Sequence, residues 1–189
     1  MKKALSLAVL ALFLAACAQQ PNTAPFLVDY SGLGKIPLNV GSVNIVDRSG
    51  GPLTEAPYVD SQFRPSIMEA LRRWVKDRLV AQGTSGEAAF IVKEANVVGE
   101  ALPTNSGWFT REQGTKYTAH AVVEIDAKGP TAYALATAEA SRSVTLIEDP
   151  SQEEKQAAWH TLLDGLMADL NRNLEDSIHA HMGSFLVGP

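Results

Sequence analysis

A C-terminal stretch of the chain, Ser151 to Gly183, constrains the fold most, because its apolar side chains recur at helical spacing without a break. Ser151 and Glu154 have the spacing of a capping box, which predicts where the helix begins, and Gly183 predicts where it ends. A helix of about 30 residues is about 45 Å long, so it could cover a whole sheet. The apolar stripe consists of Trp159, Leu162, Leu163, Leu166, Met167, Leu170, Leu174 and Ile178.

Three long strands are predicted before this helix, at about 88–102, 116–127 and 131–147. The middle one alternates: Tyr117, Ala119, Ala121, Val123 and Ile125 fall on one face, and polar residues fall on the other, as in a half-buried antiparallel strand. The last segment places five alanines on one face, from Ala132 to Ala140, where a helix could approach closely. Helix propensity alone would also fit this run, but the turn at 128–130 favours a strand that pairs with the preceding one.

A first strand is predicted at about 38–46 and a first helix at about 66–82, where Ser66 and Glu69 form a second capping-box pattern. The predicted order is therefore β-α-β-β-β-α. We expect an α+β fold: a single domain with a mainly antiparallel four-stranded sheet and two helices packed on one face.

The N-terminus has the composition of a secretory signal. Lys2 and Lys3 precede an uncharged apolar run from Ala4 to Ala16, which is shorter than the roughly 20 residues of a membrane-spanning helix. The run ends in Leu14-Ala15-Ala16-Cys17, and Cys17 is the one cysteine of the chain. The alternative is an ordinary secretory signal with an incidental cysteine.

Leu14 to Cys17 resembles the lipobox of bacterial lipoproteins. The resemblance implies cleavage before Cys17, a diacylglyceryl thioether on its sulfur and acylation of the new N-terminus. Two or more acyl chains anchor a protein stably to a membrane. In the lipoproteins that this motif resembles, aspartate after the cysteine marks retention at the inner membrane. Ala18 stands there in this chain, so the resemblance implies the outer membrane, facing the periplasm, with the inner membrane as the alternative.

The resemblance divides the chain into a signal peptide at 1–16, a lipidated N-terminus and tether at 17–37, and an α+β periplasmic domain at 38–189. Removal of two lysines with the signal takes the net charge from −5 to −7. An acidic domain of this kind argues against nucleic acid as a partner. We expect a membrane-protein partner or a lipid instead.

Two loops carry the candidate contact residues. The predicted hairpin connection at 103–115 places Trp108 and Phe109 side by side among polar residues, a pattern typical of partner contacts or membrane-interface insertion. A lid folded back over the sheet end is the alternative for Trp108. The connection 48–65 is unusually long and carries Tyr58 and Phe63; connections of this length are usually functional or mobile, so a plain flexible loop is the alternative.

Catalytic patterns are poor. The chain contains no nucleophile elbow, zincin motif, phosphate-binding loop or dinucleotide fingerprint, and we expect no catalytic residue, no metal and no cofactor. His120 and Glu124, both predicted to face outward from one strand, could form an acid–base pair, but a solvated sheet face is the simpler interpretation.

Three further segments, Leu38-Asn39-Val40, Val46-Asp47-Arg48 and Arg78-Leu79-Val80-Ala81-Gln82-Gly83-Thr84, resemble an uncharacterised group of alphaproteobacterial envelope lipoproteins. The predicted architecture is also similar to the lipopolysaccharide-assembly lipoprotein and to auxiliary lipoproteins of ABC-type lipid transporters. These likenesses imply a non-enzymatic accessory or assembly subunit of an envelope or lipid-transport complex. The alternatives are a lipid-binding carrier module and, third, an envelope hydrolase.

Overall fold

The computed structural model describes residues 29–103 and 113–187. Its larger sheet has the strand order β2–β4–β5–β6. β2 runs parallel to β4, whereas the β4–β5 and β5–β6 pairs are antiparallel. A smaller sheet pairs β1 with β3 in parallel. The strands are β1 (Ile36–Leu38), β2 (Ser42–Asp47), β3 (Leu79–Ala81), β4 (Glu87–Ala101), β5 (Gln113–Lys128) and β6 (Tyr133–Ile147).

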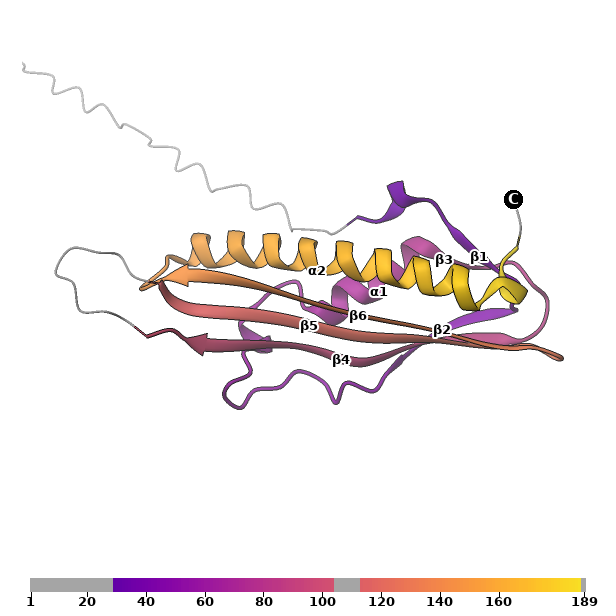
Figure 1. Ribbon diagram of the computed structural model, residues 1–189, viewed down its shortest axis with the longest axis horizontal. Coiled ribbons are helices and arrows are strands. Elements are labelled where there is room, and N and C mark those ends of the chain that lie inside the picture. Colours follow the sequence, from indigo (N-terminus) through magenta and orange to yellow (C-terminus); the bar gives the residue numbers. More distant parts are fainter. Residues whose placement is uncertain (1–28, 104–112, 188–189) are drawn as a thin grey trace, which may run out of the picture.

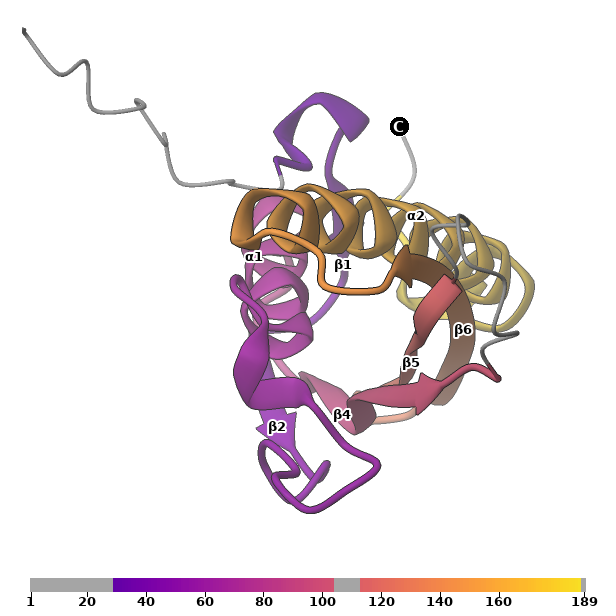
Figure 2. The same cartoon turned by 90° about the vertical axis from the view of Figure 1, so that its left-hand side faces the viewer.

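Two helices cover one side of the larger sheet. α1 (Ile67–Arg78) and α2 (Gln152–His181) lie on the inner side of the curve that the strands describe (Figure 2). α2 extends along the length of the long strands (Figure 1). The prediction of an α+β fold with a mainly antiparallel four-stranded sheet and two helices on one face is confirmed.

The core forms where the apolar patterns predicted it. All eight residues of the α2 stripe are buried, and both helices begin with a complete capping box. Ala134, Ala136, Ala138 and Ala140 of β6 are buried in the same core cluster as the α2 stripe. Small side chains on the strand therefore leave room for the large side chains of the helix.

Helix α2 also covers part of the outer edge of β6 with polar side chains. The backbone N–H of Thr137 donates to Oγ of Ser177 at 3.0 Å. Nδ2 of Asn173 donates to the backbone carbonyl of Glu139 at 2.8 Å. Because an edge strand otherwise presents unpaired backbone groups, these contacts close the middle of this edge to further strands.

Two predicted elements differ from the structure for reasons of local geometry. The strand expected at 38–46 is divided into β1 and β2, because the chain turns at residues 39–41, where the N–H of Val40 donates to the carbonyl of Leu38, and the two strands then pair in different sheets. The helix expected at 66–82 ends at Arg78, because Leu79 is already extended and begins β3, which pairs with β1.

The folded domain begins earlier than the boundary expected at Leu38. Tyr30 and Ile36 belong to the hydrophobic core, with 5% and 8% of their surface exposed. The tether predicted from 17 to 37 therefore contains folded residues at its end. Cys17 lies outside the described residues.

Candidate binding site

The connection 48–65 is held against the sheet along part of its length. The backbone N–H of Val59 donates to the carbonyl of Val97 on β4, and the N–H of Gly99 donates to the carbonyl of Pro57, both at 2.9 Å. An isolated antiparallel bridge also joins Tyr58 to Val98. Residues 57–59 therefore act as a short extra strand beside the far half of β4.

Asp60 fixes the next turn of this connection. Its Oδ2 accepts a hydrogen bond from the backbone N–H of Leu53 at 2.8 Å, and its Oδ1 accepts one from the N–H of Val97. The residue is buried, with 8% of its surface exposed. Burial raises the pKa of Asp60, although the two backbone hydrogen bonds act in the opposite direction. The carboxylate of Asp60 thus links the loop, through Leu53, to strand β4, through Val97.

A gap remains on β4 between β2 and the loop strand. Where β2 ends, the N–H of Arg48 donates to the carbonyl of Val92 at 2.8 Å, and the β4 register then shifts at a bulge. Backbone groups two residues apart on a strand point to the same side. The N–H and carbonyl of Ala95 therefore face the same edge as those of Val97, which the loop engages. This stretch of the edge has no neighbouring strand among the described residues.

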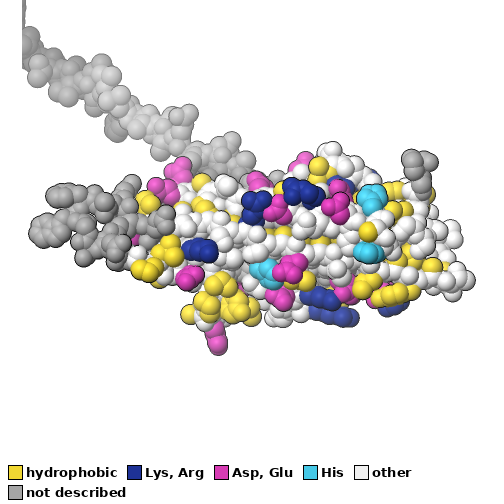
Figure 3. Space-filling model, in the orientation of Figure 1, with side chains coloured by type: hydrophobic (Ala, Val, Ile, Leu, Met, Phe, Trp, Pro, Cys, Tyr) yellow, Lys and Arg dark blue, Asp and Glu magenta, His cyan; other side chains and the backbone are white. Residues whose placement is uncertain are grey.

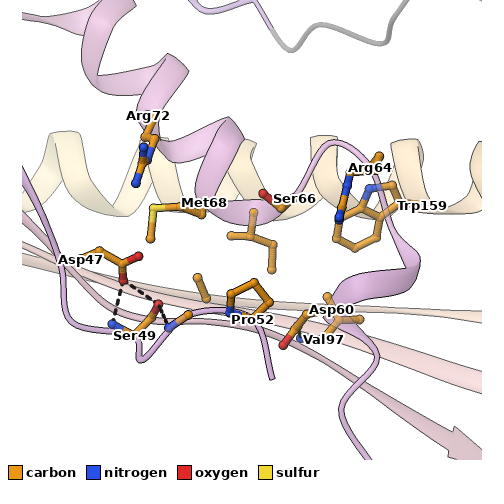
Figure 4. A pocket seen from close by; sticks show the side chains of 13 residues that line it. Asp47, Ser49, Pro52, Asp60, Arg64, Ser66, Met68, Arg72, Val97 and Trp159 are labelled. Atoms are coloured by element: carbon orange, nitrogen blue, oxygen red, sulfur yellow. Dashed lines mark hydrogen bonds between the residues drawn. The ribbon is translucent and has the colours of Figure 1, made fainter. Parts of the chain in front are cut away.

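A cavity of about 240 Å³ lies at this gap, between the loop, the start of α1 and the edge of β4. Figure 4 shows its lining. Met68 and Arg72 come from α1, Ser49 and Pro52 come from the loop, and Trp159 comes from α2. The cavity is thus apolar in its middle and carries charged side chains at its rim.

The two acidic groups of the lining are already engaged in holding the loop. Asp60 accepts the two backbone hydrogen bonds described above. Oδ1 of Asp47 accepts from both the N–H and the hydroxyl of Ser49, at 3.0 and 2.7 Å. Both carboxylates therefore have a structural task within the fold.

The two arginines of the rim are engaged much less. Arg64 donates one hydrogen bond, to the carbonyl of Phe63 at 2.8 Å. Neither Arg64 nor Arg72 forms an ion pair within the described residues. Both guanidinium groups lower the pKa of the nearby Glu69, after the larger effect of the hydrogen bond from the backbone of Ser66. The rim therefore offers mainly hydrogen-bond donors.

The predicted contact residues have different outcomes. Tyr58 lies on the loop strand and is partly exposed. Phe63, the other contact residue expected on this connection, is buried in the core: it is 4% exposed, stacks on Trp159 at 4.7 Å between ring centroids and meets Tyr117 edge-on. The loop turns inward at this point and delivers the ring to the core. Trp108 and Phe109 lie outside the described residues.

The histidine on the outer face of the sheet does not pair with Glu124. Nδ1 of His120 lies 3.2 Å from Oε2 of Glu94, and Nε2 lies 3.0 Å from Oε1 of Glu139. Glu124 pairs with Lys93 instead. Neighbouring strands thus supply the partners of His120, and the acid–base pair with Glu124 that the sequence allowed is not formed.

The comparisons with known proteins add no relative. No family model matches the chain, and no curated protein sequence matches it. Within the residues that the structure describes, no group of three or more His, Cys, Asp or Glu side chains could hold a metal ion. None of the helices in the described ranges is long and apolar enough to cross a membrane.

The residues that shape the cavity, above all Asp60, Arg64 and Arg72, belong to no motif in the sequence. The unusual length of the connection 48–65 pointed to Asp60 and Arg64, whereas nothing in the sequence pointed to Arg72, which lies on α1. The remaining information is spatial, because the cavity needs the loop, both helices and the edge of β4 to converge.

Proposed function

We propose that this chain is a lipid-anchored, non-enzymatic subunit of the bacterial cell envelope, whose folded domain binds a membrane-protein partner through the connection 48–65. Cys17 carries the anchor in this proposal, and the outer membrane, facing the periplasm, is the proposed location. The chain then assists an envelope or lipid-transport complex in assembly or in operation.

The proposed binding role is supported by the exposed apolar side chains on the connection 48–65. Figure 3 shows hydrophobic side chains gathered on the part of the loop that projects from the body of the protein. Pro52, Ala56 and Pro57 are exposed there, and Leu53 and Tyr58 are partly exposed. An apolar group held in place by hydrogen bonds to a sheet loses little conformational entropy on binding, which favours a contact surface over a flexible connection.

A site-specific photo-crosslink tests this role. The photoreactive residue p-benzoylphenylalanine would replace Tyr58 in the full-length lipoprotein in cells, and the matched control would carry it at Tyr133. Tyr133 lies on β6 and is 60% exposed, so it is at least as accessible but does not belong to the loop. We expect one defined adduct with a membrane protein from Tyr58 and none from Tyr133. Equal labelling at both positions, or none at Tyr58, would remove the basis of the proposal.

Two further variants separate the anchor from the contact. Exchange of residues 1–17 for a secretory signal that is cleaved without lipid attachment would release the protein from the membrane fraction if the lipid attachment is as proposed, with the crosslink weakened because the local concentration falls. Trp108→Ser with Phe109→Ser would weaken the same crosslink if the second loop shares the partner. A crosslink unchanged in the double variant would restrict the contact to the connection 48–65.

A lipid-binding carrier is the second candidate. The space between α2 and β6, where a carrier of this architecture would hold an acyl chain, is filled by Leu163, Leu166 and Leu170 against the alanines of the strand. The cavity at the β4 gap supports this candidate better, because it is open and is lined by both apolar and charged side chains.

A further inference from the structure

We infer that the cavity at the gap of β4 binds a small anionic amphiphile: a carboxylate or phosphate monoester on a short aliphatic or ring-containing body. This inference deepens the proposed binding role and rests on it for its biological meaning. The residues that carry it are Arg64 and Arg72 at the rim and Met68 and Trp159 in the lining.

The size of the cavity limits the apolar body. An apolar cavity of about 150 Å³ accommodates benzene, and this one measures about 240 Å³. It is smaller than the roughly 300–1,000 Å³ of ordinary drug-sized sites. The body that fits is therefore one ring or one short chain, and a lipid with two long acyl chains does not fit inside.

The expected charge of the ligand follows from which charged side chains of the lining already have hydrogen-bond or ion-pair partners within the fold. Each oxygen of Asp60 accepts one backbone hydrogen bond, and Oδ1 of Asp47 accepts both bonds from Ser49. Oδ2 of Asp47 is then the one carboxylate oxygen of the lining for which the described residues supply no hydrogen bond. The two guanidinium groups make no ion pair with the described residues and present planar forks of N–H donors, which match carboxylate and phosphate oxygens. Donors at the rim therefore outnumber acceptors, so an anionic headgroup is favoured over a cationic one.

The edge of β4 adds a fixed element of recognition. The backbone N–H of Ala95 faces the gap where neither β2 nor the loop strand reaches it. A ligand oxygen in the cavity can accept from this donor without any movement of the sheet. Because a strand holds its backbone groups rigidly, such a contact restricts the orientation of the ligand.

Calorimetric titration of the mature chain, residues 17–189 with Cys17→Ser, tests the inference, since this protein lacks both the lipid and the apolar segment 4–16 and needs no detergent. The probes are octanoate and octyl phosphate, with octan-1-ol and octylammonium as controls. We expect at least one of the two anions to bind at least tenfold more tightly than either control, and the stronger of them to indicate a carboxylate or a phosphate. Tighter binding of octan-1-ol or of octylammonium, or no binding of either anion, would overturn the inference.

Matched variants then locate the site. Arg64 and Arg72 lie at opposite ends of the lining (Figure 4), so one small headgroup is held by one of them. Either Arg64→Gln or Arg72→Gln should therefore weaken the anion by about tenfold or more, as expected for loss of a charge-assisted hydrogen bond, and Ala95→Leu should weaken all probes by filling the cavity. Lys76→Gln, an equal loss of charge on the exposed face of α1, should change nothing. Unchanged binding in the two arginine variants would refute the site even if the anion binds.

The chain length of the ligand supplies an independent reading. From butanoate to octanoate, affinity should rise by up to about fourfold for each methylene that enters the cavity, and then level off when the cavity is full. If affinity rises with ligand length in Ala95→Leu as it does in the wild-type protein, the aliphatic chain of the ligand does not lie in this cavity. If no probe binds while the crosslink at Tyr58 persists, the ligand inference fails and the proposed partner contact stands. If an anion binds as expected but Tyr58 gives no crosslink, the proposed partner contact fails and the ligand inference stands.

Discussion

Replacement of Asp60 by asparagine tests whether one buried carboxylate holds the connection 48–65 to the sheet. The two oxygens accept from two different backbone N–H groups, those of Leu53 and Val97. Asparagine keeps one acceptor oxygen and turns its amide group toward the other N–H, so one charge-assisted bond is lost and one donor stays unpaired. A hydrogen bond to a charged group contributes about 1.5–3 kcal/mol.

The opposing effect is the burial of charge. Burial raises the pKa of Asp60, which means that the fold disfavours the ionised form, and asparagine removes that penalty. We expect the lost bond to outweigh it and Asp60→Asn to lower the free energy of unfolding by about 1–3 kcal/mol at neutral pH. Urea unfolding measures the change, and faster hydrogen exchange at the amides of Leu53 and Val97 locates it.

The pH dependence follows from the sign of the shift. A raised native pKa means that the native state binds the proton more readily than the unfolded state, so the wild-type protein gains stability from this group as the pH falls from neutral toward about 4. The asparagine side chain of the variant does not titrate and cannot gain this contribution, so the deficit of the variant should widen on acidification. Asp47→Asn is the control, because Asp47 is exposed and its bonds to Ser49 share one oxygen that asparagine retains. A neutral or stabilising effect of Asp60→Asn would refute the reasoning.

Three further changes test other parts of the fold. Ala136→Leu should lower the free energy of unfolding in urea by about 1–3 kcal/mol, because the added atoms meet the α2 side chains at a position that is 0% exposed. Ser151→Ala should cost about 1 kcal/mol in the same assay by removing the cap of α2. The pKa of Asp169 is held below its usual range chiefly by its hydrogen bond from Arg142. Asp169→Asn should therefore be less stable than wild type at pH 7, with the difference shrinking as the pH falls below about 4; a difference that grew instead would contradict the assignment.

The long elements were predictable because their patterns are local. The eight-residue stripe of α2 and the alternation from Tyr117 to Ile125 each repeat often enough to distinguish a helix from a strand, and burial follows them residue by residue. β1 and β3 escaped prediction because each has three residues and finds its partner some 40 positions away in the chain. Leu79 to Ala81 also continue the apolar character of the preceding helix, so nothing in the sequence separates them from it.

The candidate site was predictable only as a region. The length of the connection 48–65 identified the segment, but Tyr58 and Phe63 have opposite environments although both are aromatic and lie five positions apart. What separates them is the inward turn after Asp60, whose carboxylate accepts a hydrogen bond from the backbone N–H of Val97, distant in sequence. Which of the two aromatic side chains is buried therefore depends on contacts between the loop and β4, which the sequence pattern of the loop does not contain.

The asymmetry between the two outer strands of the larger sheet limits how copies of this protein can join. Growth of a fibre by strand addition requires every copy to offer two accepting edges, one on each side. Ser177 and Asn173 occupy backbone groups in the middle of the β6 edge, so β2 is the more open of the two outer strands of the larger sheet, and two copies that pair through β2 use this edge in both. Molecules confined to a membrane surface by an anchor meet far more often than molecules in solution. If this protein is anchored as proposed, the cover that α2 places on the β6 edge opposes polymerisation by strand addition even when copies meet often.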